Sequence, residues 1–324
     1  MSVAGTAPLV IGTRGSQLAL WQARHVASCL ESIPRVDARV FLKIIRTSGD
    51  RDRARSAAGF SEKGIFVREI EEALLNKEID LAVHSMKDLP STLPAGLSLV
   101  AFPLRADVRD ALVTSDGRAL RDLPDGAVVG TGSLRRRAQL LRARPDLTFI
   151  EMRGNVDTRL AKLAGGEANA LVLAMAGLTR LGLGGTMRRP LSTRTCLPAP
   201  CQGALALEAR QGDDRVRALA AGLDHVPTRQ QVEAERVVLA ELDAGCLVPL
   251  GTLARHEPDG ESLSVVGRVV SPAGDRVVEA RVSGPAAESA ALGHRLADEL
   301  RAAGADEILE RPGAAAGGTQ HAPD

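Results

Sequence analysis

Aromatic residues are scarce in this 324-residue chain, which contains five Phe, one Trp and no Tyr. Proteins that bind single-stranded nucleic acid use aromatic side chains as stacking platforms, so this scarcity argues against that class. An excess of one charge is missing too, because 41 basic residues are balanced by 40 acidic ones and leave a formal net charge of +1. Bulk binding to nucleic acid depends on a large basic excess. We therefore expect no nucleic-acid partner.

Long hydrophobic runs are also missing from the sequence. The longest apolar stretch lies around Ala168–Leu178 and is too short to span a bilayer. The N-terminal segment has no cationic region followed by a long apolar run, so we expect no signal peptide. These features predict a cytoplasmic protein without a membrane partner.

The four cysteines do not form a CxxC pair, so a zinc site or any other metal site is not expected. Cys29, Cys196 and Cys201 have apolar or proline-rich neighbours and are interpreted as small buried hydrophobic residues. Cys246 comes just after an expected helix end, where the partial negative charge of the helix disfavours a thiolate. A conventional cysteine nucleophile is therefore doubtful there, and an attachment point on a loop is the alternative.

Strand and helix patterns alternate along the first two-thirds of the chain, which predicts parallel sheets covered by helices. A helix that carries Leu18, Trp21 and Leu30 is expected to be capped by Ser16. Another carries Phe66, Ile70 and Leu74. The expected strands are 9–13, 36–46, 81–84, 97–102, 127–131, 147–151 and 170–174, and two more helices are expected over 133–144 and 156–163.

Two short segments resemble each other. GTRGS at 12–16 and GTGS at 130–133 both follow a predicted strand and open a predicted helix. Two α/β lobes of similar design would explain the match, and so would chance, because it covers only four or five residues.

The last third of the chain has a different pattern. Thr228 and Gln231 form an apparent capping box before a helical run at 232–242, and Gly245 sits where a left-handed helix stop is expected. We predict a small antiparallel α+β domain, followed by a disordered Gly/Ala/Pro-rich tail over 312–324. Its strands are expected over 248–254, 263–270 and 276–282, with two helices between 285 and 309.

The segment 83–90, with the sequence VHSMKDLP, ends a predicted strand and enters a loop. Ligands bind at strand ends in open α/β sheets. The carboxylate of Asp88, beside Lys87 and near His84, is a candidate for proton transfer. The alternative is an aspartate in an ordinary turn before Pro90.

Three predicted helices begin next to arginines, which are Arg14, the cluster Arg135–Arg137, and Arg153 with Arg159. Helix N-termini attract anions, and the guanidinium fork matches carboxylate or phosphate. Together they suggest a cleft for a polyanionic small molecule, against the alternative of three solvated helix ends.

These segments resemble the porphobilinogen deaminase family, also called hydroxymethylbilane synthases. The matching motifs appear in family order and span most of the chain from Val10 to Ala254: GTRGSQLALWQA (12–23), EKGIFVREIE (62–71), AVHSMKDLP (82–90), GTGSLRRRAQL (130–140), MRGNVDTRLAKL (152–163), LAMAGLTRLG (173–182), LPAPCQGALALE (197–208) and LDAGCLVPLG (242–251). Beyond Ala254 the likeness is one of pattern more than of residues.

The resemblance implies an α/β fold of two lobes like those of periplasmic binding proteins, with the active cleft between them, plus a small C-terminal α+β domain. The implied domains are 1–103 with 204–222, then 104–203, then 223–311. The implied enzyme is a monomeric transferase of haem-type (tetrapyrrole) biosynthesis. It would add four porphobilinogen units in turn to a dipyrromethane cofactor, with loss of ammonia, and water would then release hydroxymethylbilane.

The resemblance also implies roles for individual residues. Cys246 would hold the cofactor through a thioether, and Asp88 would protonate the departing amine, stabilise the azafulvene cation as a buried carboxylate and later take the α-proton of the new ring. The growing chain carries acetate and propionate groups, which basic and polar residues would bind. Those implied for the cofactor are Lys87, Thr131, Ser133, Arg135, Arg136 and Arg159, and those implied for the substrate are Arg14, Ser16, Phe66, Arg153, Asn155 and Arg180.

Two stretches depart from the family pattern. Cys201 stands where the family usually has Gly, and we expect it to be accommodated with a negative φ. Residues 48–61 match little beyond Gly49 and Asp50 and read as a mobile lid. The competing class is a two-lobed sensor of carboxylate ligands without catalysis, which would have no use for Cys246 or Asp88.

Overall fold

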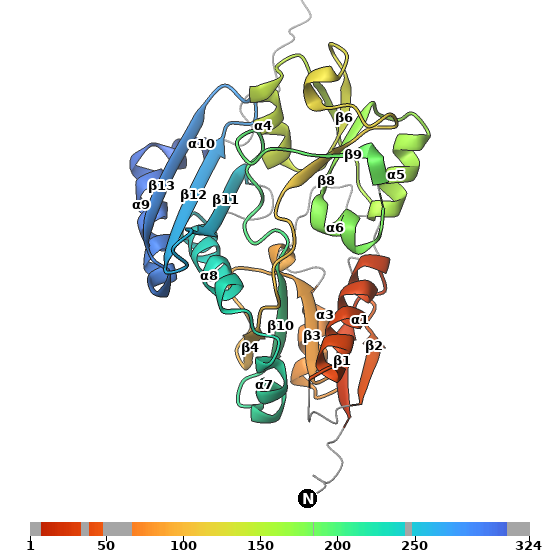
Figure 1. The fold of residues 1–324 in the computed structure, drawn as a ribbon, viewed down its shortest axis with the longest axis vertical. Coiled ribbons are helices and arrows are strands. Elements are labelled where there is room, and N and C mark those ends of the chain that lie inside the picture. Colours follow the sequence, from red (N-terminus) through yellow and green to blue (C-terminus); the bar gives the residue numbers. More distant parts are fainter. Residues whose placement is uncertain (1–7, 34–38, 48–66, 184, 244–247, 310–324) are drawn as a thin grey trace, which may run out of the picture.

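The computed structural model describes residues 8–33, 39–47, 67–183, 185–243 and 248–309. Three sheets organise this part of the chain, and in Figure 1 they form a lower lobe, an upper lobe and a third domain beside both. No helix within these ranges is long and apolar enough to cross a membrane.

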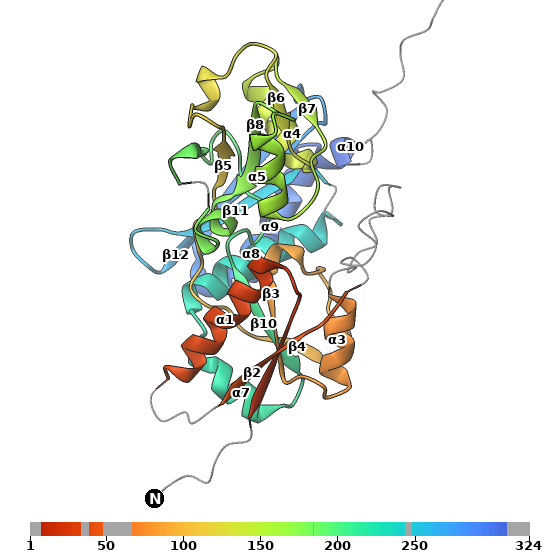
Figure 2. The ribbon, with the colours of Figure 1, turned by 90° about the vertical axis from the view of Figure 1, so that its right-hand side faces the viewer.

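The first lobe is a five-stranded sheet in the order β2-β1-β3-β10-β4. Its strands are β1 (Leu9–Thr13), β2 (Val40–Ile44), β3 (Leu81–Ser85), β4 (Leu97–Ala101) and β10 (Leu205–Arg210). Helices α1 (Gln17–Glu31), α3 (Arg68–Leu75) and α7 (Asp214–Ala221) pack on it. Strand β1 is buried because Leu9 and Ile11 pack against Val26 and Leu30 of α1. In Figure 2 helices α1 and α3 lie on opposite sides of this sheet.

The second lobe is a five-stranded sheet in the order β7-β6-β8-β5-β9. Its strands are β5 (Asp110–Val113), β6 (Val128–Gly130), β7 (Thr148–Ile150), β8 (Ala170–Ala174) and β9 (Arg188–Pro190). Its helices are α4 (Leu134–Ala143), α5 (Val156–Ala164) and α6 (Met175–Arg180), with short 3₁₀ turns at Leu120–Asp122 and Gly185–Met187. Strand β5 is buried along its length, and β8 is buried except at its last residue, Ala174, as expected of central strands covered on both faces.

The two lobes have the same internal plan. In each, three parallel strands (β2-β1-β3 and β7-β6-β8) are followed by an antiparallel strand, β10 or β5, and then by an edge strand, β4 or β9. GTRGS follows β1 and opens α1, and GTGS follows β6 and opens α4. The fold class predicted from the sequence is therefore confirmed, while the exact domain boundaries stay a prediction.

The chain crosses between the lobes twice, once from β4 to β5 and once from β9 to β10. The crossings lie side by side, because the Ala106 amide donates to the Gly203 carbonyl at 3.2 Å. Gly203 has φ +89°, and an added Cβ would lie 2.6 Å from the Ala106 oxygen, so only glycine fits. This contact ties the two crossings together at one point.

The third domain is an antiparallel sheet of β11 (Leu250–His256), β12 (Ser262–Val270) and β13 (Val277–Pro285). Helices α8 (Val226–Glu241), α9 (Ser289–Ala302) and α10 (Ala305–Leu309) cover it, with a 3₁₀ turn at Ala286–Glu288. Its core is formed by Val238, Leu263, Val265, Leu296 and Leu300. In Figure 1 helix α8 runs between this sheet and the first lobe.

The predicted capping box at Thr228 is wrong, because α8 begins at Val226 and Thr228 lies inside its first turn. The cap is His225, whose Nδ1 accepts the Thr228 amide at 3.3 Å. The Thr228 hydroxyl accepts the amide of Arg105 at 3.1 Å and so serves the first crossing instead. Gly245, the segment 48–61 that was expected to be a lid, and the expected tail at 312–324 lie outside the described residues.

Candidate active site

A cleft of about 300 Å³ lies between the lobes, at the ends of β3 and β8 and the starts of α1 and α5. Ser16 caps α1 by accepting the Ala19 amide at 3.3 Å, and Asn155 is the cap residue of α5. Both residues line the cleft, so the positive ends of two helices face it. This arrangement suits an anionic ligand.

The side chains lining the cleft carry an excess of positive charge. Five cations against two acids leave a formal charge of +3. The cations are Arg14, Lys87, Arg136, Arg159 and Arg180, and the acids are Asp88 and Asp157. The structure thus brings together most of the basic residues that the sequence suggested for a polyanion site.

Lys87 and Asp88 lie on the 3₁₀ turn Met86–Asp88 that follows β3. Burial lowers the pKa of Lys87, and Arg136 and Arg135 lower it further, while Asp88 and Asp110 act in the opposite direction. Its ammonium group donates to Gln202 Oε1 at 3.3 Å. Asp88 is exposed in the cleft, so the expectation of a buried carboxylate is wrong.

Arg159 and Arg180 are partly buried cations of the cleft. Burial lowers the pKa of Arg180 to about 10, and burial together with Arg136 lowers that of Arg159. Arg180 donates to the Gly203 carbonyl at 2.8 Å and lies 5.9 Å from the Trp21 ring centre, while Arg159 donates to the Gly154 carbonyl at 2.7 Å. Neither has a carboxylate partner among the described residues, which leaves both suited to bind a ligand carboxylate.

Arg135 and Arg136 share one buried carboxylate, that of Asp110 at the start of β5. Arg135 reaches Oδ2 at 2.8 Å, and Arg136 reaches Oδ1 through Nε at 3.0 Å and Nη2 at 2.7 Å. Burial opposes ionisation of Asp110, but the two guanidinium groups outweigh it and hold its pKa well below the usual range. Arg136 lines the cleft, whereas Arg135 does not and also donates to the Leu197 carbonyl at 2.7 Å.

The other residues suggested from the sequence do not line the cleft or lie outside the described residues. Ser133 caps α4 by accepting the Arg136 amide at 3.4 Å, and the Thr131 hydroxyl accepts the Ser133 amide at 3.2 Å. Neither lines the cleft, and nor does Arg153, which is exposed and pairs with Glu151 at 2.5 Å. Phe66 and Cys246 lie outside the described residues.

Gln202 is a site residue that sequence reasoning missed. Its oxygen accepts from Lys87 in the first lobe, and its amide nitrogen donates to Asp110 Oδ1 at 2.9 Å and the Val108 carbonyl at 2.8 Å. One side chain of the second crossing therefore connects the cleft cations of both lobes. Only its place beside Gly203 in the segment 197–208 hinted at such a role.

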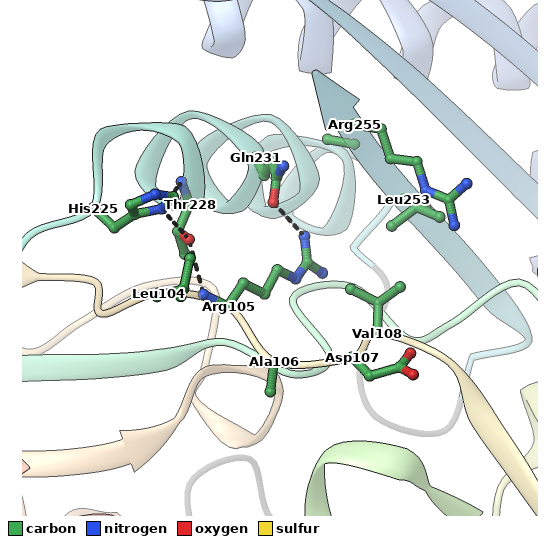
Figure 3. A pocket seen from close by; sticks show the side chains of 11 residues that line it. Leu104, Arg105, Ala106, Asp107, Val108, His225, Thr228, Gln231, Leu253 and Arg255 are labelled. Atoms are coloured by element: carbon green, nitrogen blue, oxygen red, sulfur yellow. Dashed lines mark hydrogen bonds between the residues drawn. The ribbon is translucent and has the colours of Figure 1, made fainter. Parts of the chain in front are cut away.

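A second hollow, of about 370 Å³, lies where the first crossing meets α8 and β11. Figure 3 shows Arg105, Gln231 and Thr228 around it, with Val108 and Leu253 on the opposite side. The Arg105 guanidinium is bound by both oxygens of Glu235, at 2.7 and 2.9 Å. This hollow lacks the clustered cations of the cleft, so the cleft is the candidate active site.

Cys201 has φ +61°, so the expected negative φ is wrong. It is one of few described residues with a Cβ in the left-handed region, and its amide donates to Glu235 Oε2 at 2.5 Å. Its side chain is buried against Met86, Leu89 and Val232.

No group of three or more His, Cys, Asp or Glu side chains that could hold a metal ion occurs in the described ranges.

Comparison with known proteins identifies the family. The family model "Porphobilinogen deaminase, dipyromethane cofactor binding domain" matches residues 9–218, and "Porphobilinogen deaminase, C-terminal domain" matches 229–302. Porphobilinogen deaminase of Thermus thermophilus is 47% identical over 302 residues, covering 93% of this chain and 98% of that protein. The Desulforudis audaxviator enzyme is 49% identical over 304 residues, covering 94% and 97%.

The solved structures found to be similar have low sequence identity to this chain. A TRAP periplasmic solute binding protein from Desulfovibrio salexigens is 12% identical, with a TM-score of 0.43, and covers 68% of this chain and 73% of its own. The VFT2 domain of Bordetella pertussis BvgS is 16% identical, with a TM-score of 0.39, and covers 66% and 86%. The two family models, by contrast, match both the two-lobed part and the third domain, and the curated relatives are similar over nearly their whole length. This chain therefore belongs to the porphobilinogen deaminase family.

Proposed function

We propose that this chain joins four porphobilinogen molecules in turn to a dipyrromethane cofactor, losing one ammonia each time, and then releases hydroxymethylbilane by hydrolysis. The observation that carries the proposal is the cleft with a formal charge of +3 beside the Asp88 turn. Each pyrrole ring carries an acetate and a propionate, so substrate and growing chain are polycarboxylates that match this charge. We propose further that the enzyme acts as a monomer.

The donor set of the cleft fits a polycarboxylate cofactor. Lys87, Arg136 and Arg159 line one connected space, and burial makes it costly for Lys87 and Arg159 to stay charged without an anion nearby. These side chains would bind the carboxylates of the dipyrromethane, with support from Thr131, Ser133 and Arg135. The bound group supplies the nucleophilic pyrrole carbon to which the first new ring is joined.

Cys246 is proposed as the point of covalent attachment through a thioether. It follows α8 by five residues, and α8 lies between the third domain and the first lobe. Intact mass before and after denaturation should show a covalent increment of two pyrrole units, which Cys246→Ser should abolish. Peptide mapping of the adduct to Cys29, Cys196 or Cys201 would defeat the assignment.

The incoming substrate is proposed to lie near the α1 end of the cleft. Arg14 and Ser16 line the cleft at the start of α1, and Asn155 lines it at the start of α5. Arg180, the last residue of α6, also lines it and is held in place by the Gly203 carbonyl. Arg153 and Phe66 are proposed for the same role from the family resemblance alone. Charge-assisted hydrogen bonds to the acetate and propionate would orient the aminomethyl group.

Asp88 is proposed as the acid–base group. Its exposed carboxylate projects from the turn into the cleft, where a substrate ring can reach it. Asp88 would deliver a proton to the leaving amine as the C–N bond breaks, and its carboxylate would stabilise the azafulvene cation formed from the substrate. After the carbon–carbon bond forms, the same carboxylate would take the α-proton and be ready for the next unit.

Single-turnover release of ammonia tests this role. Asp88→Asn keeps the size but removes the charge and the transferable proton, so we expect it to bind substrate and to retain only a small residual rate of turnover. Asp88→Glu moves the carboxylate by one methylene, and a displacement of about 1 Å costs on the order of 10²-fold in rate. Each variant must first be shown to carry the cofactor, because the cofactor is built by related chemistry. Ammonia release by Asp88→Asn at the wild-type rate would show that another group does the proton transfer.

A further inference from the structure

The position of Asp88 is set by the backbone of its turn. Among the described residues its carboxylate has no hydrogen-bond partner, and it lies exposed in the cleft. Nothing but the path of the chain around 86–91 therefore fixes where this carboxylate stands relative to a bound substrate.

The near side of the turn is anchored to the second crossing and to α8. The Met86 amide donates to the Ala204 carbonyl at 3.0 Å, and the Leu89 amide closes the turn on the Met86 carbonyl at 3.2 Å. The side chains of Met86 and Leu89 are buried in one cluster with Val232 of α8. Helix α8 is thus the support on which the turn rests.

The far side of the turn is held by Arg236, one helical turn after Val232 and on the same face of α8. Its Nη1 donates to the Pro90 carbonyl at 3.2 Å, and its Nη2 donates to the Ser91 carbonyl at 2.6 Å. Two bonds from one planar guanidinium fix both the position and the direction of the chain just after Asp88.

Arg236 carries its charge in an unusual setting. Burial lowers its pKa, and the neighbouring Cys201 and Glu208 only partly offset this. No carboxylate lies within ion-pair distance of it in the described part of the chain, so two carbonyl oxygens are its direct partners. A half-buried cation with this partner set costs folding free energy, and a neutral side chain would avoid that cost. We therefore look for the role of Arg236 in the segment after Asp88, whose Pro90 and Ser91 carbonyls it binds.

We propose that Arg236 is a positioning residue for the reaction: by binding the carbonyl oxygens of Pro90 and Ser91, it holds the Asp88 carboxylate at the place where the substrate amine departs. The inference rests on the proposed role of Asp88. Since α8 ends five residues before Cys246, the same helix ties the acid–base turn to the domain proposed to carry the cofactor.

The test compares Arg236→Leu, which removes both hydrogen bonds, with Arg229→Gln as the matched control. Arg229 lies two turns earlier on the same face of α8 and donates to the Val100 carbonyl at 3.2 Å, away from the turn. For Arg236→Leu we expect kcat to fall on the order of 10- to 100-fold with KM within about twofold, because a small displacement of a catalytic group acts on the chemical step. For Arg229→Gln we expect kcat within about twofold of the wild-type value, even if this variant loses as much thermal stability as Arg236→Leu.

A double-mutant cycle with Asp88→Asn identifies the route of the effect. If Arg236 acts through Asp88, then Arg236→Leu should slow single-turnover ammonia release in the wild-type background and have no further effect on Asp88→Asn. The inference would be overturned if Arg236→Leu slowed ammonia release equally in both backgrounds. It would also be overturned if the substitution raised KM and left kcat unchanged. Should Arg236→Leu fail to fold, Arg236→Lys carries the same comparison and should show a smaller loss of kcat in the wild-type background only.

The same measurements separate the two proposals. Wild-type ammonia release by Asp88→Asn would overturn the proposed function of that carboxylate. If Arg236→Leu released ammonia at the wild-type rate while Asp88→Asn was nearly inactive, only the positioning role of Arg236 would be overturned.

Discussion

Glu235 holds Arg105 through both of its carboxylate oxygens, at 2.7 and 2.9 Å, with neither side chain accessible to solvent beyond 5%. The same carboxylate accepts the amides of Cys201 at 2.5 Å and Ala254 at 2.8 Å. One side chain of the third domain therefore binds both crossings between the lobes and its own sheet.

Replacing Glu235 with Gln should destabilise the protein strongly. Arg105 would keep a buried charge without an anion, which costs about 3–5 kcal/mol. Urea unfolding measures this loss. The control is Glu307→Gln, which removes an exposed pair with Arg276 at 2.7 Å and should change the free energy of unfolding by less than about 1 kcal/mol. Equal losses for the two variants would contradict the central role of Glu235.

Asp110→Asn should destabilise the protein. It should also make the free energy of unfolding less dependent on pH in the acid range. The carboxyl group has a lowered pKa in the folded state, so its stabilising effect is present above its unfolded pKa of about 3.9 and is lost as the pH falls below that value. Urea unfolding from pH 7 to pH 3 should show a steeper decline for the wild type than for the variant. Parallel declines would mean that other carboxylates dominate acid unfolding.

Cys196 and Cys201 should resist alkylation in the native protein. Burial and Asp110 raise the pKa of Cys196 to about 12, and burial and Glu235 raise that of Cys201 well above its usual range. Since the thiolate is the reactive form, iodoacetamide at pH 8 should label both residues only after unfolding. Cys29, which is half-buried, provides the internal comparison by peptide mapping. Native labelling of Cys201 at the rate of Cys29 would show that the crossing opens.

Cys201→Gly should be nearly neutral for stability. Glycine relieves the left-handed backbone, worth about 1 kcal/mol, but gives up a small buried side chain worth a similar amount. Cys201→Val adds a β-branched side chain at φ +61° and should be much less stable than either. Thermal unfolding of the three proteins checks this order, and a valine variant as stable as the glycine variant would contradict it.

Arg180→Leu should weaken substrate binding while the fold stays intact. With a pKa of about 10, Arg180 remains charged at neutral pH, and a hydrogen bond to a charged group contributes about 1.5–3 kcal/mol. KM should therefore rise by roughly tenfold or more. Arg281→Leu, an exposed change on β13, is the control and should leave KM unchanged. An unchanged KM for Arg180→Leu would remove this residue from the site.

The sequence predicted elements well where the local signal was strong. The strand expected at 170–174 is β8 residue for residue, and Ser16 caps α1 as predicted. Strand β10 was missed, because its partners β3 and β4 lie more than 100 residues earlier and no local pattern marks the pairing. The start of α8 was misplaced because a tertiary contact with Arg105 recruited Thr228.

The candidate site was predictable in its charges and less so in its connections. Arg14, Arg136 and Arg159 could be found because they sit at predicted helix starts. The sharing of Asp110 by two arginines, and the link from Lys87 through Gln202 to Asp110, join residues 25 to 115 positions apart. Such pairings depend on how the lobes pack against each other, and the spacing of residues along the chain does not predict this packing.

The place of β10 within the first sheet bears on how the protein is made. Strand β4 pairs with β10, and β10 separates it from β3, yet 103 residues lie between the end of β4 at Ala101 and the start of β10 at Leu205. At about 5–20 residues per second, a ribosome needs roughly 5–20 s to synthesise that interval. During this time β3 and β4 are exposed without their shared neighbour, while the strands of the second lobe emerge in one continuous stretch. The lobe that begins the chain is thus expected to complete its sheet after the lobe that follows it, and a chaperone that shields unpaired strand edges would act on residues 81–101 of the nascent protein.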